Sequence, residues 1–351
     1  MAAIDDFFRE TKRVGASDLH MVVGRPPMLR LNGDLVPTKF PVLTQKSNRE
    51  YVYEILTPAQ REHLEKNLDL DFAYELAGVG RFRGNIFFQH RGLGAVFRLI
   101  PSKVSSLEQL RMPPLVKKLA DSRSGLILVT GPTGSGKSTT LAAMIDYINE
   151  TREEHILSIE DPIEFVHQNK RSLITQREIG AHTSSFHSAL KVAGRQDPDI
   201  LLVGEMRDLE TISLALTLAS FGILVFGTLH TNSAMKTVDR IIDVYPPEEQ
   251  PQIRVMLAEV LRGVIAQQLL KTADGRGRIA AVEVLISSPA LANMIREGKT
   301  NLIASYMQAG AAEGMQTMDM ALIKLVQEQV VTLEAALEKA QDRAFVQSKF
   351  R

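Results

Sequence analysis

The chain has 351 residues, enough for two domains at roughly 150 residues each. Its 41 basic and 41 acidic side chains cancel, so we expect no overall positive field and no nucleic-acid partner. The absence of cysteine excludes disulfides, thiolate metal sites and cysteine nucleophiles, and suits a reducing compartment.

The amino terminus, MAAIDDFFRETKR, lacks the apolar core of a signal peptide. No apolar run approaches the roughly 18 residues that a transmembrane helix needs. We therefore expect a cytoplasmic protein whose contact with a membrane is peripheral.

Residues 1–100 are predicted to form a small α+β domain. Asn32-Gly33 stands between two alternating stretches and predicts a tight hairpin, because both residues tolerate positive φ. A helical stretch over residues 47–68 follows, and then three strands that should form an antiparallel meander. The middle strand alternates a packing face with a polar face that presents arginines. The packing face consists of Phe82, Ile86 and Phe88. The polar face consists of Arg81, Arg83 and Asn85.

Residues 101–114 carry prolines and serines and are the predicted linker. Over residues 115–351, apolar strands alternate with amphipathic helices, which predicts an α/β domain with a largely parallel sheet covered by helices on both faces. The part that follows Pro247 is predicted to be mostly helical, apart from one strand over residues 278–286.

Residues 131–138, GPTGSGKS, fit the pattern G-x-x-x-x-G-K-S between a predicted strand and a predicted helix. Glycines in such a loop let backbone N–H groups turn inward around phosphate oxygens, and the N-terminus of the following helix favours an anion. Lys137 would reach the β and γ phosphates, and the Ser138 hydroxyl would bind Mg²⁺. The pattern therefore predicts a nucleoside triphosphate site. The predicted contacts are Gly131, Pro132, Thr133, Gly134, Ser135, Gly136, Lys137, Ser138 and Thr139.

Three carboxylates follow predicted strands: Glu160 and Asp161 follow one, and Glu205 follows another. Because the carboxyl ends of parallel strands share an edge, all three should converge beside the phosphate loop. ATP hydrolysis needs one carboxylate to orient or deprotonate water and another to hold the metal, for which we expect Asp161. Each acid could instead cap the helix that follows it.

His230 follows a further strand and fits either a buried structural role or a contact with the γ-phosphate. Gly204-Glu205 departs from the Asp-Glu that ends a typical Walker B strand, so the usual metal aspartate is missing.

Four motifs, in this order, resemble the Walker A, Asp box, Walker B and His box motifs of secretion-superfamily ATPases: GPTGSGKSTT, SIEDPIEFVH, QDPDILLVGEMRDLETI and GTLHT. ASDLHM, RFRGNIFFQHRG, AVFRLIPSKV and IREGKT resemble the branch of the type IV pilus retraction motors, over nearly the whole chain. The resemblance implies a PAS-like N-terminal domain and a RecA-like ATPase domain. It also implies a homohexameric ring with ATP and Mg²⁺ where chains meet, and a platform protein in the inner membrane as partner.

By this resemblance Glu160 belongs to the box that handles the water, Glu205 is the Walker B glutamate and His230 senses the nucleotide state. Arg81 and Arg83 would act as arginine fingers, although a solvated strand face is the alternative for both. The further arginines assigned to the nucleotide are Arg98, Arg195 and Arg240.

Two positions depart from the family pattern. Residues 221–223 read Phe-Gly-Ile where the family usually has Thr-Gly-His. Residues 193–195 read Ala-Gly-Arg where it usually has Ala-Leu-Arg, and a glycine inside a helix costs up to about 1 kcal/mol relative to alanine. We expect both to lie near the nucleotide edge and to affect turnover rather than the phosphate contacts.

The predicted function is ATP hydrolysis that withdraws pilin subunits from the base of a pilus. A pilus assembly or type II secretion ATPase is the nearest alternative, but those relatives usually carry an extra N-terminal domain and a cysteine-rich zinc insertion. This chain lacks cysteine and starts at the PAS-like unit, which favours retraction. A DNA-translocating motor would need basic loops facing a ring pore, and a regulator would bind ATP without cleaving it.

Overall fold

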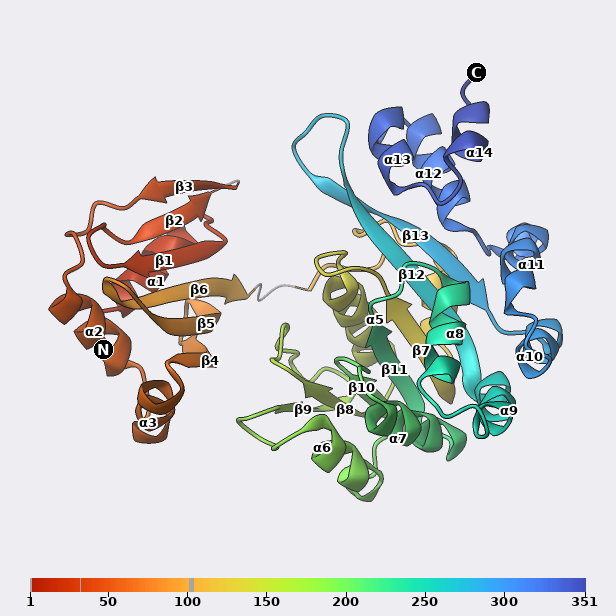
Figure 1. The fold of residues 1–351 in the computed structure, drawn as a ribbon, viewed down its shortest axis with the longest axis horizontal. Helices are drawn as coiled ribbons and strands as arrows, with labels where there is room; N and C mark the ends of the chain where they lie inside the picture. Colours follow the sequence, from red (N-terminus) through yellow and green to blue (C-terminus); the bar gives the residue numbers. More distant parts are fainter. Residues whose placement is uncertain (1, 32, 101–103) are drawn as a thin grey trace. The chain divides into compact units, whose positions relative to one another are not determined.

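The computed structural model describes residues 2–31, 33–100 and 104–351. The chain divides into two compact units, Met1–Lys103 and Val104–Arg351 (Figure 1). Of the expected linker, residues 101–103 lie outside the described residues, as does Asn32 of the predicted hairpin. Residues 104–113 belong to the second unit, because Leu107 is buried in its core.

The first unit is a six-stranded antiparallel sheet in the order β3-β2-β1-β6-β5-β4. Its strands are β1 (Asp18–Val22), β2 (Met28–Leu31), β3 (Asp34–Pro37), β4 (Asp69–Leu76), β5 (Gly80–Gln89) and β6 (Gly92–Ile100). Its helices are α1 (Asp5–Arg13), α2 (Gln45–Glu54) and α3 (Pro58–Asn67). The predicted hairpin joins β2 to β3 with Leu31 opposite Asp34, and the predicted meander is β4-β5-β6.

Two expectations for this unit were wrong in detail. Residues 47–68 form two helices instead of one, because Thr57 caps a new helix at Pro58, whose ring excludes the preceding residue from helical backbone. On β5, Phe82 and Ile86 are fully buried, but Phe88 is 39% exposed and does not belong to the packed core.

The second unit contains a seven-stranded sheet in the order β13-β12-β7-β11-β10-β8-β9. All neighbouring strands are parallel except β12 and β13, which confirms the predicted largely parallel sheet. The strands are β7 (Gly125–Thr130), β8 (His155–Glu160), β9 (Leu173–Glu178), β10 (Ile200–Val203), β11 (Leu224–Leu229), β12 (Leu261–Lys271) and β13 (Arg278–Ile286).

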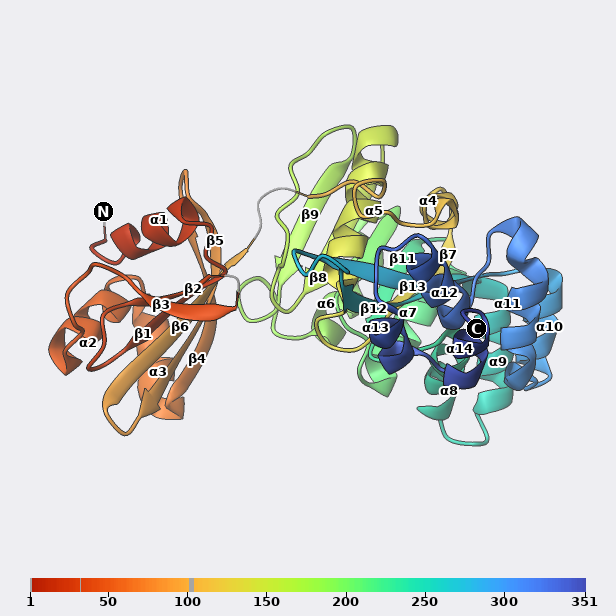
Figure 2. The same ribbon diagram turned by 90° about the horizontal axis from the view of Figure 1, so that it is seen from above.

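Helix α5 connects β7 to β8 and so moves the chain toward the β9 end of the sheet. Helix α7 connects β10 to β11 and moves the chain in the opposite direction. Right-handed crossovers therefore place these helices on opposite faces, as Figure 2 shows. The helices are α4 (Pro114–Ala120), α5 (Lys137–Thr151), α6 (Phe186–Ala193), α7 (Leu209–Ser220), α8 (Ala234–Asp243), α9 (Gln250–Val260), α10 (Pro289–Arg296), α11 (Ile303–Ala309), α12 (Met318–Gln327), α13 (Leu333–Lys339) and α14 (Arg343–Ser348). Among the described residues, none of the helices is both long and apolar enough to cross a membrane.

The part after Pro247 was predicted to be mostly helical, and β12 shows where that was wrong. Its sequence, LRGVIAQQLLK, consists largely of good helix formers and has no clean alternation. The strand lies between β7 and β13, which satisfy its backbone on both sides. Tertiary pairing therefore overrides its local propensity. Strand β9 was not predicted either.

The parallel register fixes two edges of this sheet. At the carboxyl edge, Thr130 pairs with Leu229, and Val203 pairs with Ile159, so the segments that leave β7, β11, β10 and β8 emerge side by side. At the amino edge, Gly125 and Ile200 both pair with Leu224. Residues just before these strands are therefore separated from residues just after them by the length of a strand.

Candidate nucleotide site

The phosphate loop leaves β7 at the carboxyl edge and runs into α5. Gly131, Gly134 and Gly136 have φ of +146°, +76° and +90°, which side chains other than glycine rarely adopt. A Cβ on Gly131 would also collide with the carbonyl oxygen of Gln267. These glycines therefore permit a loop conformation that turns N–H groups inward.

Gln267 on β12 braces this loop and was not predicted from the sequence. Its Nε2 donates a hydrogen bond of 2.6 Å to the carbonyl oxygen of Ser135, and its side chain is 1% exposed. The motif pattern contains no signal for it, since it lies 132 residues from Ser135 in a segment predicted as helix.

The loop fits a chain of phosphates. The Ser135 hydroxyl is buried with no hydrogen-bond partner among the described residues, and the space around Gly134 is open. Lys137 Nζ donates to the carbonyl oxygens of Gly131 at 2.9 Å and Pro132 at 3.2 Å, so the ammonium group lies against the loop. Burial lowers the pKa of Lys137, while the charge of Glu205 opposes that shift. Glu205 is therefore within electrostatic reach of the loop lysine.

Glu205 follows β10 and is held by the side chains of His230 and Arg207. His230, which follows β11, is bonded through Nε2 to Glu205 Oε1 at 2.8 Å. Arg207 forms an ion pair with the same oxygen. Burial disfavours the charged carboxylate, but these partners outweigh it and hold the pKa of Glu205 below its usual value. Arg207 was missed in the sequence, although it lies two residues beyond Glu205 in the same motif.

Glu160 ends β8 and has a different environment. Its Oε1 accepts hydrogen bonds from Ser158 Oγ at 2.6 Å and Gln176 Nε2 at 3.1 Å. Burial raises the pKa of Glu160 above its usual value, against the effect of these two donors. A carboxyl group with a raised pKa is a better proton acceptor once ionised than an ordinary one.

The two residues predicted to contact the metal lie at the same edge. Ser138 is in the first turn of α5, and Asp161 directly follows β8. The pKa of Arg207 is raised first by its bond to Glu205 and also by the charge of Asp161, which places Asp161 near this group. Within the described ranges no three acidic or histidine side chains form a metal-binding cluster.

A cavity of about 860 Å³ lies beside the phosphate loop. Gly136 and Thr139 form one wall, the β12–β13 hairpin forms another, and residues 109–112 close a third side. The cavity is large enough for a nucleoside and adjoins the start of α5.

Two predicted nucleotide residues of the second unit are not gathered at this edge. Arg195 lies in η1 (Gly194–Gln196), which leads to the amino end of β10. Arg240 lies exposed on α8.

The remaining arginines belong to the sheet of the first unit. Arg83 pairs across strands with Arg98, and Arg98 Nε donates to Asp18 at 2.8 Å. Arg81 lies on β5 opposite Ile100.

The two family departures do not lie near the nucleotide edge, and that expectation was wrong. Phe221 and Gly222 precede β11, and both departures line a cavity of about 390 Å³ at the amino edge, together with Asp199. Gly194 follows the last residue of α6 and begins η1, so it is not a glycine in an α-helix interior. The helix penalty expected for it does not apply there.

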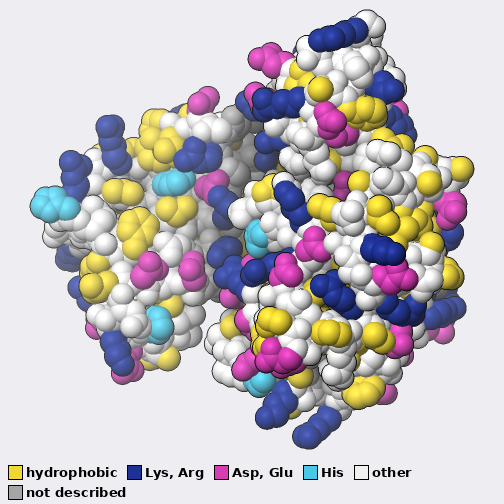
Figure 3. All heavy atoms as spheres, turned by 45° about the vertical axis from the view of Figure 1, so that its right-hand side comes forward, with side chains coloured by type: hydrophobic (Ala, Val, Ile, Leu, Met, Phe, Trp, Pro, Cys, Tyr) yellow, Lys and Arg dark blue, Asp and Glu magenta, His cyan; other side chains and the backbone are white. Residues whose placement is uncertain are grey.

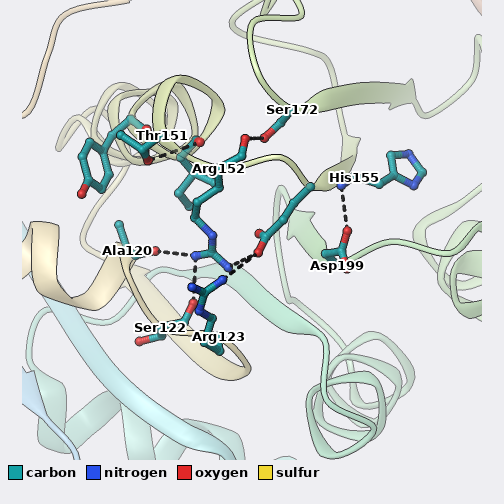
Figure 4. Close-up of polar contacts among 11 residues, drawn as sticks. Ala120, Ser122, Arg123, Thr151, Arg152, His155, Ser172 and Asp199 are labelled. Atoms are coloured by element: carbon teal, nitrogen blue, oxygen red, sulfur yellow. Dashed lines mark hydrogen bonds and ion pairs between the residues drawn. The ribbon is translucent and has the colours of Figure 1, made fainter.

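A hydrogen-bonded cluster occupies the same amino edge (Figure 4). Arg152 Nη1 donates to the carbonyl oxygens of Ala120 and Ser122 at 3.1 Å and 2.9 Å, and its Nη2 bonds to Glu154 at 2.7 Å. The cluster joins α4, α5 and β8, and its contacts are those of a structural anchor.

Comparison with known proteins agrees with this geometry. Residues 81–343 match the type II/IV secretion system protein family. The chain belongs to this family. The fold class predicted above is confirmed as an α/β RecA-like ATPase domain with a smaller N-terminal α+β PAS-like domain, and the expectation of an ATPase is confirmed.

Three relatives within this family of secretion proteins are notably similar. The type IV pilus retraction ATPase PilT of Pseudomonas aeruginosa is 53% identical over 337 residues, which cover 96% of this chain and 98% of that protein. A twitching motility protein of Neisseria gonorrhoeae is 55% identical over 316 residues, covering 90% and 84%. A crystal structure of the pilus retraction motor PilT with bound ADP superposes with a TM-score of 0.93 at 44% identity and covers 99% of both chains. The resemblance to the retraction branch is therefore confirmed.

Proposed function

We propose that this chain is an ATP-driven motor that retracts type IV pili. The observation that supports this best is the convergence, at one sheet edge, of the phosphate loop with Glu160, Glu205 and His230. That arrangement supplies the phosphate cradle and the carboxylates that ATP hydrolysis needs. The relatives named for pilus retraction and twitching motility support the pilus as the structure on which the motor acts.

In this proposal the loop from Gly131 to Thr139 holds the phosphate chain, and the adjoining cavity holds the base and ribose. Lys137 turns from the loop carbonyls to the β and γ phosphates. Mg²⁺ would supply positive charge at the phosphate oxygens, and Ser138 and Asp161 are the residues that would hold it.

The carboxylates divide the remaining work. Glu160, with its raised pKa, accepts a proton from the attacking water, and Glu205 fixes the position of that water or of the hydrated metal. His230 is bonded to Glu205 and would face the γ-phosphate, so it can report the nucleotide state.

The arginines complete the site across chains in a homohexameric ring. Arg81 and Arg83 would neutralise charge on the transferred phosphoryl group, and Arg98 would contact the nucleotide. Arg195 and Arg240 would also contact the nucleotide, at the boundary between neighbouring chains of the ring. The partner would be the platform protein of the pilus, which would place the ring at the cytoplasmic face of the inner membrane.

The alternatives are separable by experiment. On the face drawn in Figure 3, basic and acidic side chains are interspersed, in line with the balanced composition. Affinity for DNA that falls steeply with salt would favour a translocating motor instead. Phosphate release measured on the purified protein separates the enzyme from an ATP-binding regulator.

Deleting the gene tests the direction of force. Cells that accumulate pili and lose surface motility would support retraction, whereas bald cells would assign the chain to assembly. Complementation with the wild-type gene should restore motility, and complementation with a Glu205→Gln allele should not. Restoration by that allele would contradict a role for ATP hydrolysis.

A further inference from the structure

Arg207 is a charged residue at the carboxyl edge to which the sequence motifs assign no role. We propose that Arg207 is a positioning residue, which holds Glu205 in the orientation required for ATP hydrolysis. The inference rests on the proposed ATPase function and deepens it.

The backbone on both sides of Arg207 is fixed. Met206 is 2% exposed, its N–H donates to the carbonyl oxygen of Thr228 at 3.0 Å, and its side chain packs so closely on Gly227 that a Cβ there would collide with the sulfur. On the other side, Asp208 caps α7 by accepting the N–H of Thr211 at 2.8 Å. Arg207 therefore projects from a short segment that is anchored at both ends.

The segment before it is equally constrained. Gly204 donates its N–H to Ile159 at 2.8 Å and accepts a bond from Thr228 Oγ1 at 2.5 Å. A Cβ on Gly204 would lie 3.2 Å from Glu160 Cα, so a side chain there would press β10 away from β8. The backbone of Glu205 is thus held between the strands that carry Glu160 and His230. Its carboxylate, at the end of a flexible side chain, still needs to be oriented.

Arg207 and His230 supply that orientation together. Both bind the same oxygen, Oε1, and no described side chain or backbone group donates to Oε2. The second oxygen is therefore available to a water molecule or a hydrated metal. Without Arg207, a single histidine contact would hold the carboxylate, and rotation about its side-chain bonds would carry Oε2 out of line.

Arg207 can do this without being needed for folding. Its side chain is 76% exposed, whereas that of Glu205 is 20% exposed. Its guanidinium pairs with Glu205 and forms no hydrogen bond or ion pair with the described residues of the phosphate loop, so its loss should leave nucleotide binding largely intact. The effect is therefore expected in kcat and not in affinity.

The test compares Arg207→Ala, Arg207→Lys and wild type in the full chain. We expect Arg207→Ala to lower kcat by about 10- to 100-fold, the size typical of a misplaced catalytic group, with the Kd for ADP within about threefold of wild type. Arg207→Lys should recover part of kcat, because an ammonium group keeps the charge but not the planar geometry. Guanidinium ion at millimolar concentration should partly rescue Arg207→Ala, and sodium at equal ionic strength should not.

Arg171→Ala is the matched control. Arg171 is also an exposed arginine paired with a glutamate, Glu153, at 2.8 Å, but it precedes β9 at the amino edge. Its kcat should equal that of wild type, and thermal melting of all variants should coincide within a few degrees.

Three results would overturn the proposal: a kcat for Arg207→Ala within twofold of wild type, an ADP affinity that falls as far as kcat, or equal defects in the alanine and lysine variants without rescue by guanidinium. Wild-type protein that releases no phosphate would contradict the proposed function itself, which makes the two failures distinguishable.

Discussion

Glu160 and Glu205 lie at the same sheet edge, but their surroundings shift the pKa values of the two carboxyl groups in opposite directions. Burial raises the pKa of Glu160, whereas Arg207 and His230 outweigh burial and lower the pKa of Glu205. Two acids with separated pKa values can divide the roles of proton acceptor and fixed charge. These two roles could not be assigned from the sequence, because both residues simply follow apolar strands.

The raised pKa of Glu160 should make ATP hydrolysis depend on pH. If Glu160 accepts the proton from water, it must be ionised, so kcat should fall as pH drops through a pKa above the usual range for glutamate. The acidic limb of the kcat profile should therefore lie at higher pH than an ordinary glutamate would give. Glu160→Gln should slow hydrolysis strongly and remove that limb, while ADP still binds.

Lys137→Ala is the contrasting variant for this measurement. It should weaken ADP binding by about tenfold or more, because it removes a charge-assisted contact with phosphate. A Glu160→Gln protein with normal kcat at neutral pH would exclude Glu160 as the proton acceptor.

Among the helices and strands, α4, α5 and β8 are joined by hydrogen bonds at the amino edge of the second sheet. Arg152 has a side chain that is 11% exposed and joins the ends of α4 and α5 to the start of β8. Its bonds to Ala120 and Ser122 satisfy carbonyl groups that would otherwise be left at the end of α4.

Arg152→Ala should therefore lower the free energy of unfolding by about 3 kcal/mol, since it removes a mostly buried charge and leaves two carbonyl groups without their donor. Glu154 would keep only its longer ion pair with the exposed Arg123, at 3.5 Å. Urea denaturation followed by circular dichroism would measure this. The same substitution at the exposed Arg171 should change it by less than about 1 kcal/mol. Equal effects at the two positions would contradict the anchoring role.

Residues 221–223, which depart from the family pattern, also lie at the amino edge. Phe221 is 78% exposed at the amino edge, away from the phosphate loop. Phe221→Thr should consequently leave kcat and the Kd for ADP within about twofold of wild type, because the change is made in an exposed side chain at the opposite edge of the sheet. A loss of ATPase activity in this variant, measured by phosphate release, would show that the two edges are coupled.

At the scale of the whole molecule, the arginines assigned to the nucleotide are divided between separate units and separate sheet edges. Arg195 lies at the amino edge of the second sheet, and Arg81, Arg83 and Arg98 lie in the first unit. A ring of chains is the arrangement that would let such residues serve a shared site.

We therefore expect the protein with nucleotide to have about six times its chain mass of 38.9 kDa at micromolar concentration. Size-exclusion chromatography with light scattering measures this directly. A monomer with full ATPase activity would contradict the ring, and the wild type without nucleotide serves as the comparison.

The phosphate loop, the parallel strands around it and the acids that follow those strands could all be predicted from the sequence alone. These signals are local: glycines that require positive φ, continuous apolar runs and a fixed order of motifs. Because parallel strands share a carboxyl edge, the order of motifs was enough to predict that Glu160, Asp161 and Glu205 converge. For His230 the sequence left a buried structural role and a contact with the γ-phosphate both open.

The residues that support that site could be identified only once the strands were placed in the folded chain. Gln267 belongs to none of the motifs, and the motif that contains Arg207 does not tell which side chain it contacts. Strand β12 has the composition of a helix, so its place between β7 and β13 depends on pairing across more than a hundred residues. The same limit explains the error at Gly194 and Phe221. A residue's distance from a motif in the sequence does not tell which edge of the sheet it occupies, because each strand carries the chain from one edge to the other.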